Sequence, residues 1–266
     1  MCEQNAPVSA LGVDDLAIKI VCDNNPYTSK LNTAWGFSAL LTGAEKTILF
    51  DTGGNGPLLL YNMEKLAIAP DKIDVVVLSH IHGDHAGGLS SLLEKNRQVA
   101  VYVPRSFPKK FRENVQKKGA KLIEVKEPLK ICQDIYSAGQ LGKLIKEQFL
   151  IIRTKAGLII MTGCAHPGIL KMVEAARDSA DGDILLVMGG FHLEWATTGR
   201  IQKVISAFRQ LHVQYVGPCH CSGHRARSLF ERCYGKNYIN IGAGKVIAVA
   251  KLPSPGYRDA QSGVCD

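Results

Sequence analysis

The sequence lacks several patterns that mark common classes of protein. No apolar run approaches the roughly 20 residues that a membrane-spanning helix needs. The N-terminal residues have neither the basic start nor the apolar core of a signal peptide. The chain also lacks an internal repeat, a low-complexity tract or a linker. We therefore expect one domain over residues 1–266, located in the cytoplasm and not associated with a membrane.

Cys-x-x-Cys pairs are missing as well, and aromatic residues are scarce among the basic ones. The eight cysteines include no Cys-x-x-Cys pair, which disfavours zinc ribbons and thioredoxin-type redox sites. In a cytoplasmic chain of this kind we expect free, mostly buried thiols. In the basic segment 105–126, Phe111 is the one interleaved aromatic residue after Phe107, so the sequence predicts no stacking platform for nucleic acid, and a nuclease is disfavoured.

Positive charge is abundant, and much of it is local. The net charge is +8, and residues 105–126 hold eight Lys or Arg against two Glu. Such a run is typical of a solvated surface. Alternatively, the segment forms a lid or wall that attracts an anionic substrate such as a phosphate ester. On that hypothesis Lys109, Lys110 and Arg112 bind substrate.

The order of the predicted elements indicates an α/β fold with two layered sheets. Apolar, β-branched segments predict strands at 16–22, 35–43, 46–53, 72–80, 98–104, 120–128, 149–163 (two strands), 183–190, 213–220 and 245–251. Helical spacing predicts helices at 57–68, 87–96, 168–178, 199–211 and 223–233. Strands come first and then alternate with helices, so we expect two sheets with the helices outside.

Metal-ligand residues crowd together directly after the buried strand at 72–80. His80, His82, Asp84 and His85 occupy four of six positions. Zinc and iron prefer imidazole nitrogen, and a carboxylate adds charge neutralisation. At the end of an extended strand His80 and His82 point the same way, toward one metal; after the turn at Gly83, Asp84 and His85 face a second. We predict one or two divalent ions, with zinc favoured and manganese or iron as alternatives.

Further histidines end three later strands. His166 and His220 each follow an apolar strand, and we predict that both are metal ligands. His192 follows a Gly-Gly turn at another strand end, where it is placed to donate a hydrogen bond to substrate, a catalytic role. Asp84 is predicted to be catalytic too, because it can orient the nucleophile as well as bind metal.

These motifs together resemble the metallo-β-lactamase superfamily. The resemblance rests on His80-x-His82-x-Asp84-His85, on the Ala-Gly-Gly-Leu that follows and on the preceding Phe-Asp-Thr-Gly that contains Asp51; it extends over about residues 35–250. It implies a four-layer αββα sandwich of two mixed sheets, with a binuclear metal site at one edge. It also implies that His220 is the last ligand and that Asp51 lies beneath the histidine loop and orients ligands.

The chain departs from the superfamily pattern at Cys164. Many members have Gly-Asp where this chain has Gly163-Cys164, and that Asp bridges both metals. Cys164 is then either a thiolate ligand or a small buried residue behind the ligands, and we favour the second. We expect the same of Cys219 and Cys221.

Several functions remain compatible with these residues. The leading hypothesis is a metal-dependent hydrolase that uses a metal-activated water on a small, anionic, phosphorylated substrate. The segments LFDTG, LSHIHGDHAGGL, TGCAHPGI, GGFHL and CHCSG resemble one branch in particular. That branch includes synthases that join a dihydropterin to a ribofuranosylaminobenzene phosphate, which is the first alternative. The second is a non-catalytic metal or redox sensor, suggested by the cysteines near the histidines.

Overall fold

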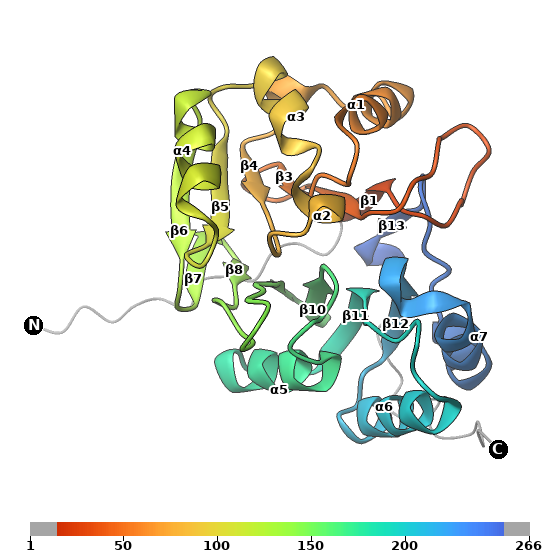
Figure 1. The fold of residues 1–266 in the computed structure, drawn as a ribbon. Coiled ribbons are helices and arrows are strands. Elements are labelled where there is room, and N and C mark those ends of the chain that lie inside the picture. Colours follow the sequence, from red (N-terminus) through yellow and green to blue (C-terminus); the bar gives the residue numbers. More distant parts are fainter. Residues whose placement is uncertain (1–14, 253–266) are drawn as a thin grey trace, which may run out of the picture.

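Two mixed sheets lie face to face and carry helices on their outer sides (Figure 1). The structure is a computed structural model that describes residues 15–252. The predicted four-layer αββα sandwich of two mixed sheets is confirmed. The N-terminal residues, on which the expectation of no signal peptide rests, lie outside the described residues. Within residues 15–252, no helix combines the length and the apolar character needed to cross a membrane.

The first sheet has seven strands in the order β13-β1-β2-β3-β4-β5-β6. Strands β3 to β6 run parallel to one another, and β13, β1 and β2 pair antiparallel. The strands span Ala17–Cys22 (β1), Ser38–Thr42 (β2), Ile48–Phe50 (β3), Val75–Val77 (β4), Ala100–Pro104 (β5), Lys121–Val125 (β6) and Val246–Ala248 (β13).

The second sheet has six strands in the order β12-β11-β10-β9-β8-β7. Strands β10, β11 and β12 are parallel, whereas β7, β8 and β9 form an antiparallel meander that ends on β10. The strands span Leu129–Cys132 (β7), Ile135–Ser137 (β8), Leu150–Thr154 (β9), Gly157–Thr162 (β10), Ile184–Gly190 (β11) and Tyr215–Cys219 (β12).

The helices divide between the two outer layers. Those on the seven-stranded sheet are α1 (Gly56–Lys65), α2 (Gly83–Ala86), α3 (Leu89–Lys95) and α4 (Lys109–Lys117); those on the six-stranded sheet are α5 (Ile169–Ser179), α6 (Thr198–Gln210) and α7 (Gly223–Tyr234). Short 3-10 turns occupy Pro70–Lys72, His220–Ser222, Gly235–Asn237 and Val249–Lys251.

Three apolar layers hold the sandwich together. Side chains such as Ile18, Phe50, Ile152 and Met188 fill the space between the sheets. A second cluster packs α5, α6 and α7 on one sheet, and a third packs α1, α3 and α4 on the other. Burial on both faces explains why the parallel strands are continuous apolar runs in the sequence.

Some predicted elements are shorter than expected for local reasons. Strand β3 ends at Phe50 because Asp51 adopts a positive φ of 56°. Strand β4 ends at Val77, and two residues later the Ser79 backbone N–H donates to the Asp51 carboxylate, 2.7 Å away, instead of to a neighbouring strand. Both departures come from groups that shape the loops beyond the strands.

Other elements were not predicted at all. Helix α4 has little apolar periodicity, because among its residues only Val115 is buried. Strands β7 and β8 are short and separated by a two-residue turn, so their residues show no alternation that would predict a strand. The basic segment 105–126 is built into the fold as α4 and the edge strand β6.

The cysteines agree in part with the expectation of free thiols. Buried free thiols are present at Cys22, Cys132, Cys164, Cys219 and Cys221. The expectation is wrong for Cys233, which is disulfide-bonded.

Candidate metal centre

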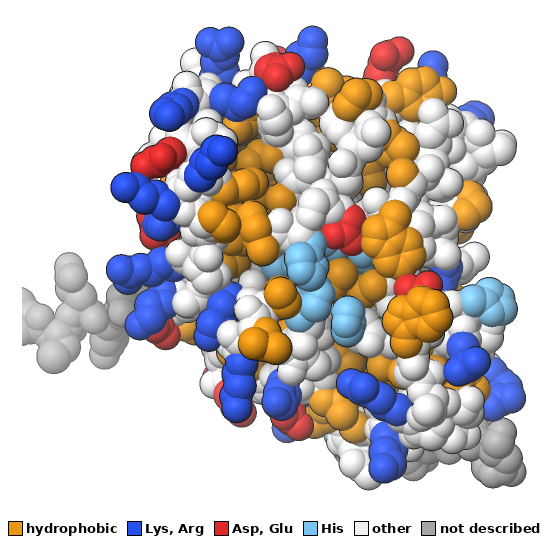
Figure 2. Space-filling view, in the orientation of Figure 1, with side chains coloured by type: hydrophobic (Ala, Val, Ile, Leu, Met, Phe, Trp, Pro, Cys, Tyr) orange, Lys and Arg blue, Asp and Glu red, His pale blue; other side chains and the backbone are white. Residues whose placement is uncertain are grey.

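The histidines predicted from the motifs gather where strands of both sheets end. Strands β3, β4, β10, β11 and β12 point their carboxyl ends at this edge, and the loops that follow them carry the polar side chains. Figure 2 shows the histidine side chains together on one face of the molecule. Open α/β sheets bind their ligands at this kind of edge.

One set of potential ligands consists of His80, His82 and His166. Their ligand atoms all lie within 4.8 Å of one another. His80 Nε2 is 3.2 Å from His82 Nδ1, and the ring centroids of His80 and His166 are 4.5 Å apart. The loop after β10 therefore brings His166 to the pair that follows β4, and we call these three residues the first ligand set.

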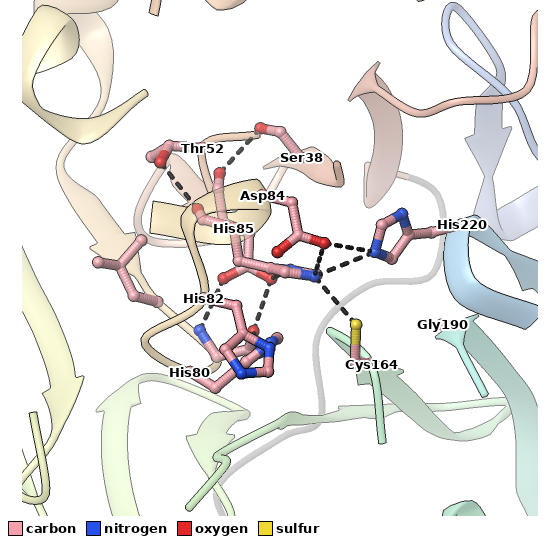
Figure 3. Close-up of polar contacts among 12 residues, drawn as sticks. Ser38, Thr52, His80, His82, Asp84, His85, Cys164, Gly190 and His220 are labelled. Atoms are coloured by element: carbon pink, nitrogen blue, oxygen red, sulfur yellow. Dashed lines mark hydrogen bonds and ion pairs between the residues drawn. The ribbon is translucent and has the colours of Figure 1, made fainter. Parts of the chain in front are cut away.

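The second ligand set consists of Asp84, His85, Cys164 and His220, which also lie within 4.8 Å of one another. His85 Nε2 is 3.1 Å from Cys164 Sγ and 3.2 Å from His220 Nε2 (Figure 3). Asp84 Oδ2 lies 3.2 Å from His220 Nε2 and 3.6 Å from His85 Nε2. The two sets adjoin, since the ring centroids of His80 and His85 are 4.2 Å apart.

Outer partners fix which nitrogen of each second-set ring faces the site. The Asp51 carboxylate can only accept, so His85 must donate to it through Nδ1, at 2.7 Å. His220 donates through Nδ1 to Asn24 Oδ1 at 2.9 Å. When neutral, both rings therefore turn an Nε2 lone pair toward the other, a convergence that a bound cation would stabilise. Asp51 lies beneath the histidine loop, where it also accepts hydrogen bonds from Ser79.

The first set is oriented in the same way. Glu147 Oε2 accepts from His166 Nδ1 at 2.9 Å, and His80 Nδ1 lies 2.8 Å from Ser79 Oγ. Glu147 also accepts from the backbone N–H groups of Cys164, Ala165 and His166, each at 2.9 Å. One buried carboxylate thus fixes both the His166 ring and the loop that carries it.

Burial keeps the imidazoles of His80 and His85 neutral. It lowers the pKa of His80 to about 3 and that of His85 to about 4, and neighbouring histidines add to the effect. Burial alone would raise the pKa of Glu147, but hydrogen bonding with His166 and the proximity of His80 outweigh it and hold that pKa at about 2. Neutral imidazole, carboxylate and thiol are the ligand types that zinc, manganese and iron use, so both sets fit a divalent cation.

Unusual backbone conformations concentrate at the same edge. Asp51, Ala165, His192 and His220 adopt positive φ values of 56°, 60°, 53° and 47°. Residues other than glycine rarely adopt a positive φ, because this backbone conformation is strained. Such strained residues tend to cluster at functional sites. Each of these residues carries, or directly precedes, a side chain that faces the ligand sets.

A third cluster of potential ligands shares Cys164 with the second ligand set. His192 is exposed, its ring centroid is 4.7 Å from that of His166, and it lies with Cys164 and Cys221 within 4.8 Å. Backbone packing here is tight: a Cβ added at Gly190 would lie 2.6 Å from Cys221 Sγ and 2.3 Å from the Gly163 carbonyl oxygen. Only glycine fits at this position, and it lets the two loops meet.

Residues 36–222 match the family model of the metallo-beta-lactamase superfamily. The protein belongs to this superfamily. It is 28% identical to the 7,8-dihydropterin-6-methyl-4-(beta-D-ribofuranosyl)-aminobenzene-5'-phosphate synthase of Methanocaldococcus jannaschii, over 84% of this chain and 92% of the synthase. It is 30% identical to the uncharacterized protein MJ0448 of the same organism, over 87% of this chain and 100% of that protein.

Among solved structures, this superfamily member is similar to Tm1679, a metal-dependent hydrolase of the beta-lactamase superfamily. The TM-score is 0.74 at 28% sequence identity, and the match covers 87% of this chain and 98% of the other. YhfI from Bacillus subtilis, at a TM-score of 0.64 and 15% identity, shares the fold.

The three basic residues predicted to bind substrate are not part of the ligand sets. Lys109, Lys110 and Arg112 lie on α4, at the side of this superfamily fold and apart from the loops of the centre (Figure 1). Arg112 pairs with Glu124 of β6 at 2.5 Å, and Lys109 with Glu113 at 3.6 Å. Their charge is thus partly neutralised locally, and their role in substrate binding stays a prediction.

Sequence reasoning missed the outer partners Glu147, Asn24 and Ser79. Asn24 follows an apolar strand within an Asp-Asn-Asn run, the kind of strand-end signal that revealed the histidines. Glu147 gives a weaker signal, a single acidic residue just before the apolar run of β9. Ser79 lies inside the His80 motif, where its short polar side chain looks unremarkable.

Proposed function

We propose that the protein is a metal-dependent hydrolase that acts on a small, anionic, phosphorylated substrate. One observation carries the proposal: the Nε2 atoms of His85 and His220 face one another at 3.2 Å with the Asp84 carboxylate beside them, next to a second set of three histidines. Such an arrangement suits a pair of divalent ions. Zinc is the ion we favour, with manganese or iron as alternatives.

The two ligand sets would hold one ion each. When bound, such ions supply a water of lowered pKa as nucleophile and offset the negative charge that develops at a scissile phosphoryl or carbonyl group. Asp84 is more accessible than the carboxylates of Asp51 and Glu147, because 21% of its side chain is exposed and theirs are fully buried. Partial burial alone would raise its pKa, but the proximity of His220 and His85 outweighs that effect and holds the pKa well below the usual range. We assign it the role of accepting a hydrogen bond from the nucleophile.

The remaining roles fall to residues around the centre. His192, exposed on its strand-end turn, is placed to donate a hydrogen bond to the substrate or its leaving group. The net charge of +8 favours anionic substrates, and the lysines of α4 extend the positive surface beyond the site. A small molecule is the partner that this centre suits, and the proposal does not require nucleic acid or a membrane.

A substrate screen with one variant and one control tests the proposal. Protein loaded with zinc, manganese or ferrous iron is assayed on chromogenic phosphodiester, ester, thioester and lactone substrates. Asp84→Asn should lower kcat at least about 100-fold on any substrate that the wild type cleaves. Asp71→Asn, a matched change at an exposed carboxylate paired with Lys72, should leave kcat unchanged. Full turnover in Asp84→Asn would refute the assigned role, and absence of turnover on every substrate would refute the hydrolase.

A synthase is the second candidate, because the chain is similar to a dihydropterin-ribofuranosylaminobenzene phosphate synthase over most of both lengths. The test incubates the metal-loaded protein with 6-hydroxymethyl-7,8-dihydropterin diphosphate and β-ribofuranosylaminobenzene 5′-phosphate. Mass spectrometry of a joined product, with release of diphosphate, would support the synthase over the hydrolase. If neither activity is found, metal content that changes with thiol oxidation would favour a sensor.

A further inference from the structure

Large apolar side chains are exposed on the loops around the ligand sets. Among the large hydrophobic residues that the structure describes, the two most exposed are Leu144, at 97%, and Trp195, at 93%. Trp35 is 48% exposed. The chain has only two tryptophans, and neither is buried. Figure 2 shows hydrophobic side chains beside the exposed histidines. Exposed apolar groups gathered at one place mark binding surfaces.

Trp35 lies directly against the second ligand set. Its ring centroid is 4.9 Å from that of His220. The loop that carries it is held in place, because the Phe37 backbone N–H donates to the Asp84 carbonyl at 3.2 Å. A Cβ at Gly36 would lie 2.5 Å from the same oxygen, so the backbone approaches Asp84 as closely as glycine allows. The indole is therefore fixed at the edge of the site with half of its surface in water.

Trp195 lies three residues after His192 on an equally constrained turn. The backbone N–H groups of Leu193 and Glu194 both donate to the Cys221 carbonyl at 3.2 Å. The Ala196 N–H donates to the Leu193 carbonyl at 3.0 Å, and both of these side chains are buried. The backbone is thus anchored on either side of an indole that contacts almost nothing, which is an unusual use of a tryptophan.

Leu144 occupies the tip of a hairpin that adjoins the first ligand set. Leu141 and Glu147 exchange backbone hydrogen bonds of 2.8 and 2.9 Å at its base, and Glu147 is the residue that holds His166. A Cβ at Gly142 would lie 3.3 Å from Pro167 Cγ, so the hairpin packs on the His166 loop. Lys143 and Lys146 flank the tip and add positive charge.

We infer that Trp35, Trp195 and Leu144 form a binding subsite for a planar aromatic or heteroaromatic ring of a phosphorylated substrate. Indoles carried on anchored backbone offer flat faces, and stacking on them suits a ring better than an aliphatic chain. The lysines of the hairpin match the anionic part of the same molecule. The inference rests on the proposed function, since it names the class of substrate for that centre.

Binding measurements on matched phosphates test the subsite. Metal-loaded protein is titrated with guanosine 5′-monophosphate, phenyl phosphate and ribose 5-phosphate, the last of which has no ring to stack. Because both tryptophans belong to the subsite, intrinsic fluorescence reports ring binding without interference from other indoles. At least one aromatic phosphate should quench the fluorescence saturably and bind about tenfold more tightly than ribose 5-phosphate.

Two variants and one control locate the effect. Trp35→Leu and Trp195→Leu should keep wild-type metal content, and at least one should lose most of the tenfold preference. Tyr61→Leu, at an exposed aromatic residue on α1 beneath Lys65, should keep the preference. Equal affinity of all three phosphates for the wild type would overturn the subsite, as would a preference that survives in both tryptophan variants.

These outcomes can be distinguished from a result that contradicts the proposed hydrolase activity. Fluorescence needs no turnover, so a ring preference without hydrolysis of any substrate would contradict only the hydrolase. Hydrolysis without a ring preference would contradict only the subsite.

Discussion

Glu147→Gln is the change that most directly tests how the centre is held. The buried carboxylate accepts four hydrogen bonds, from the backbone N–H groups of Cys164, Ala165 and His166 and from His166 Nδ1. Glutamine has nearly the same shape, so packing is retained. Its amide oxygen can still accept the bonds from Cys164 and Ala165. Its NH2 group, however, faces two donors of His166 and can accept neither.

The expected size of the effect follows from those two lost bonds. A hydrogen bond to a charged group contributes roughly 1.5 kcal/mol at the lower end of its range, so the free energy of unfolding should fall by about 3 kcal/mol. The amide can regain one contact only by donating to His166 Nδ1. That contact would leave the proton on Nε2, where it blocks ligation. Loss of such an outer partner typically weakens metal binding about 10- to 100-fold.

Two measurements and a control decide the matter. Urea unfolding of metal-free protein gives the stability change, and zinc titration against a chromophoric chelator gives the affinity of each site. Asp134→Asn makes the same chemical change at another buried carboxylate, on the turn between β7 and β8, and should leave both zinc affinities intact. Wild-type zinc affinity in Glu147→Gln would refute the role given to Glu147, whatever happens to stability.

Other predictions concern the ligands and the basic surface. His82→Ala should retain the fold and lose one metal per chain by elemental analysis, and full metal content would remove the first-set assignment. Cys164→Ser, purified anaerobically beside the wild type, should keep its metal if the thiol only lines the loop; loss of metal would make it a ligand. Chelation should lower the melting temperature, because the ions bind only the folded chain. Neutralising the basic residues of α4 should raise KM for a phosphorylated substrate severalfold and weaken its dependence on ionic strength; an unchanged KM would leave a solvated surface. Those residues are Lys109, Lys110 and Arg112.

Most of the fold could be predicted from the sequence because its parallel strands are buried on both faces. Apolar runs such as those of β10 and β11 have no alternative use in a chain of this length, and their boundaries were nearly right. The pattern fails where burial is slight. Helix α4 buries only Val115, and the β7–β8 hairpin is too short to show alternation.

Of the candidate site, only the residues of metal-ligand type could be predicted from the sequence. His80, His166 and His220 follow apolar strands, and an imidazole is conspicuous at such a position. Glu147 and Asn24 act through the ring nitrogen that faces away from the centre, and they come from distant parts of the chain. Their roles depend on which loops meet in space, so spacing along the sequence could not reveal them.

The ligand sets also leave the reaction undetermined, because a hydrolase and a synthase can share them and differ in the nucleophile that arrives. The loops that carry Trp35 and Trp195 leave both indoles in contact with water, so water reaches this edge of the site. A ring stacked on those indoles would shield the same space and favour attack by a group on a second organic molecule. Hydrolysis of a small ester should therefore respond to a ring-bearing phosphate. Inhibition that excess ester does not relieve would favour the synthase, because the bound ring then excludes water from the centre; inhibition that excess ester relieves would favour a hydrolase in which these indoles serve recognition alone.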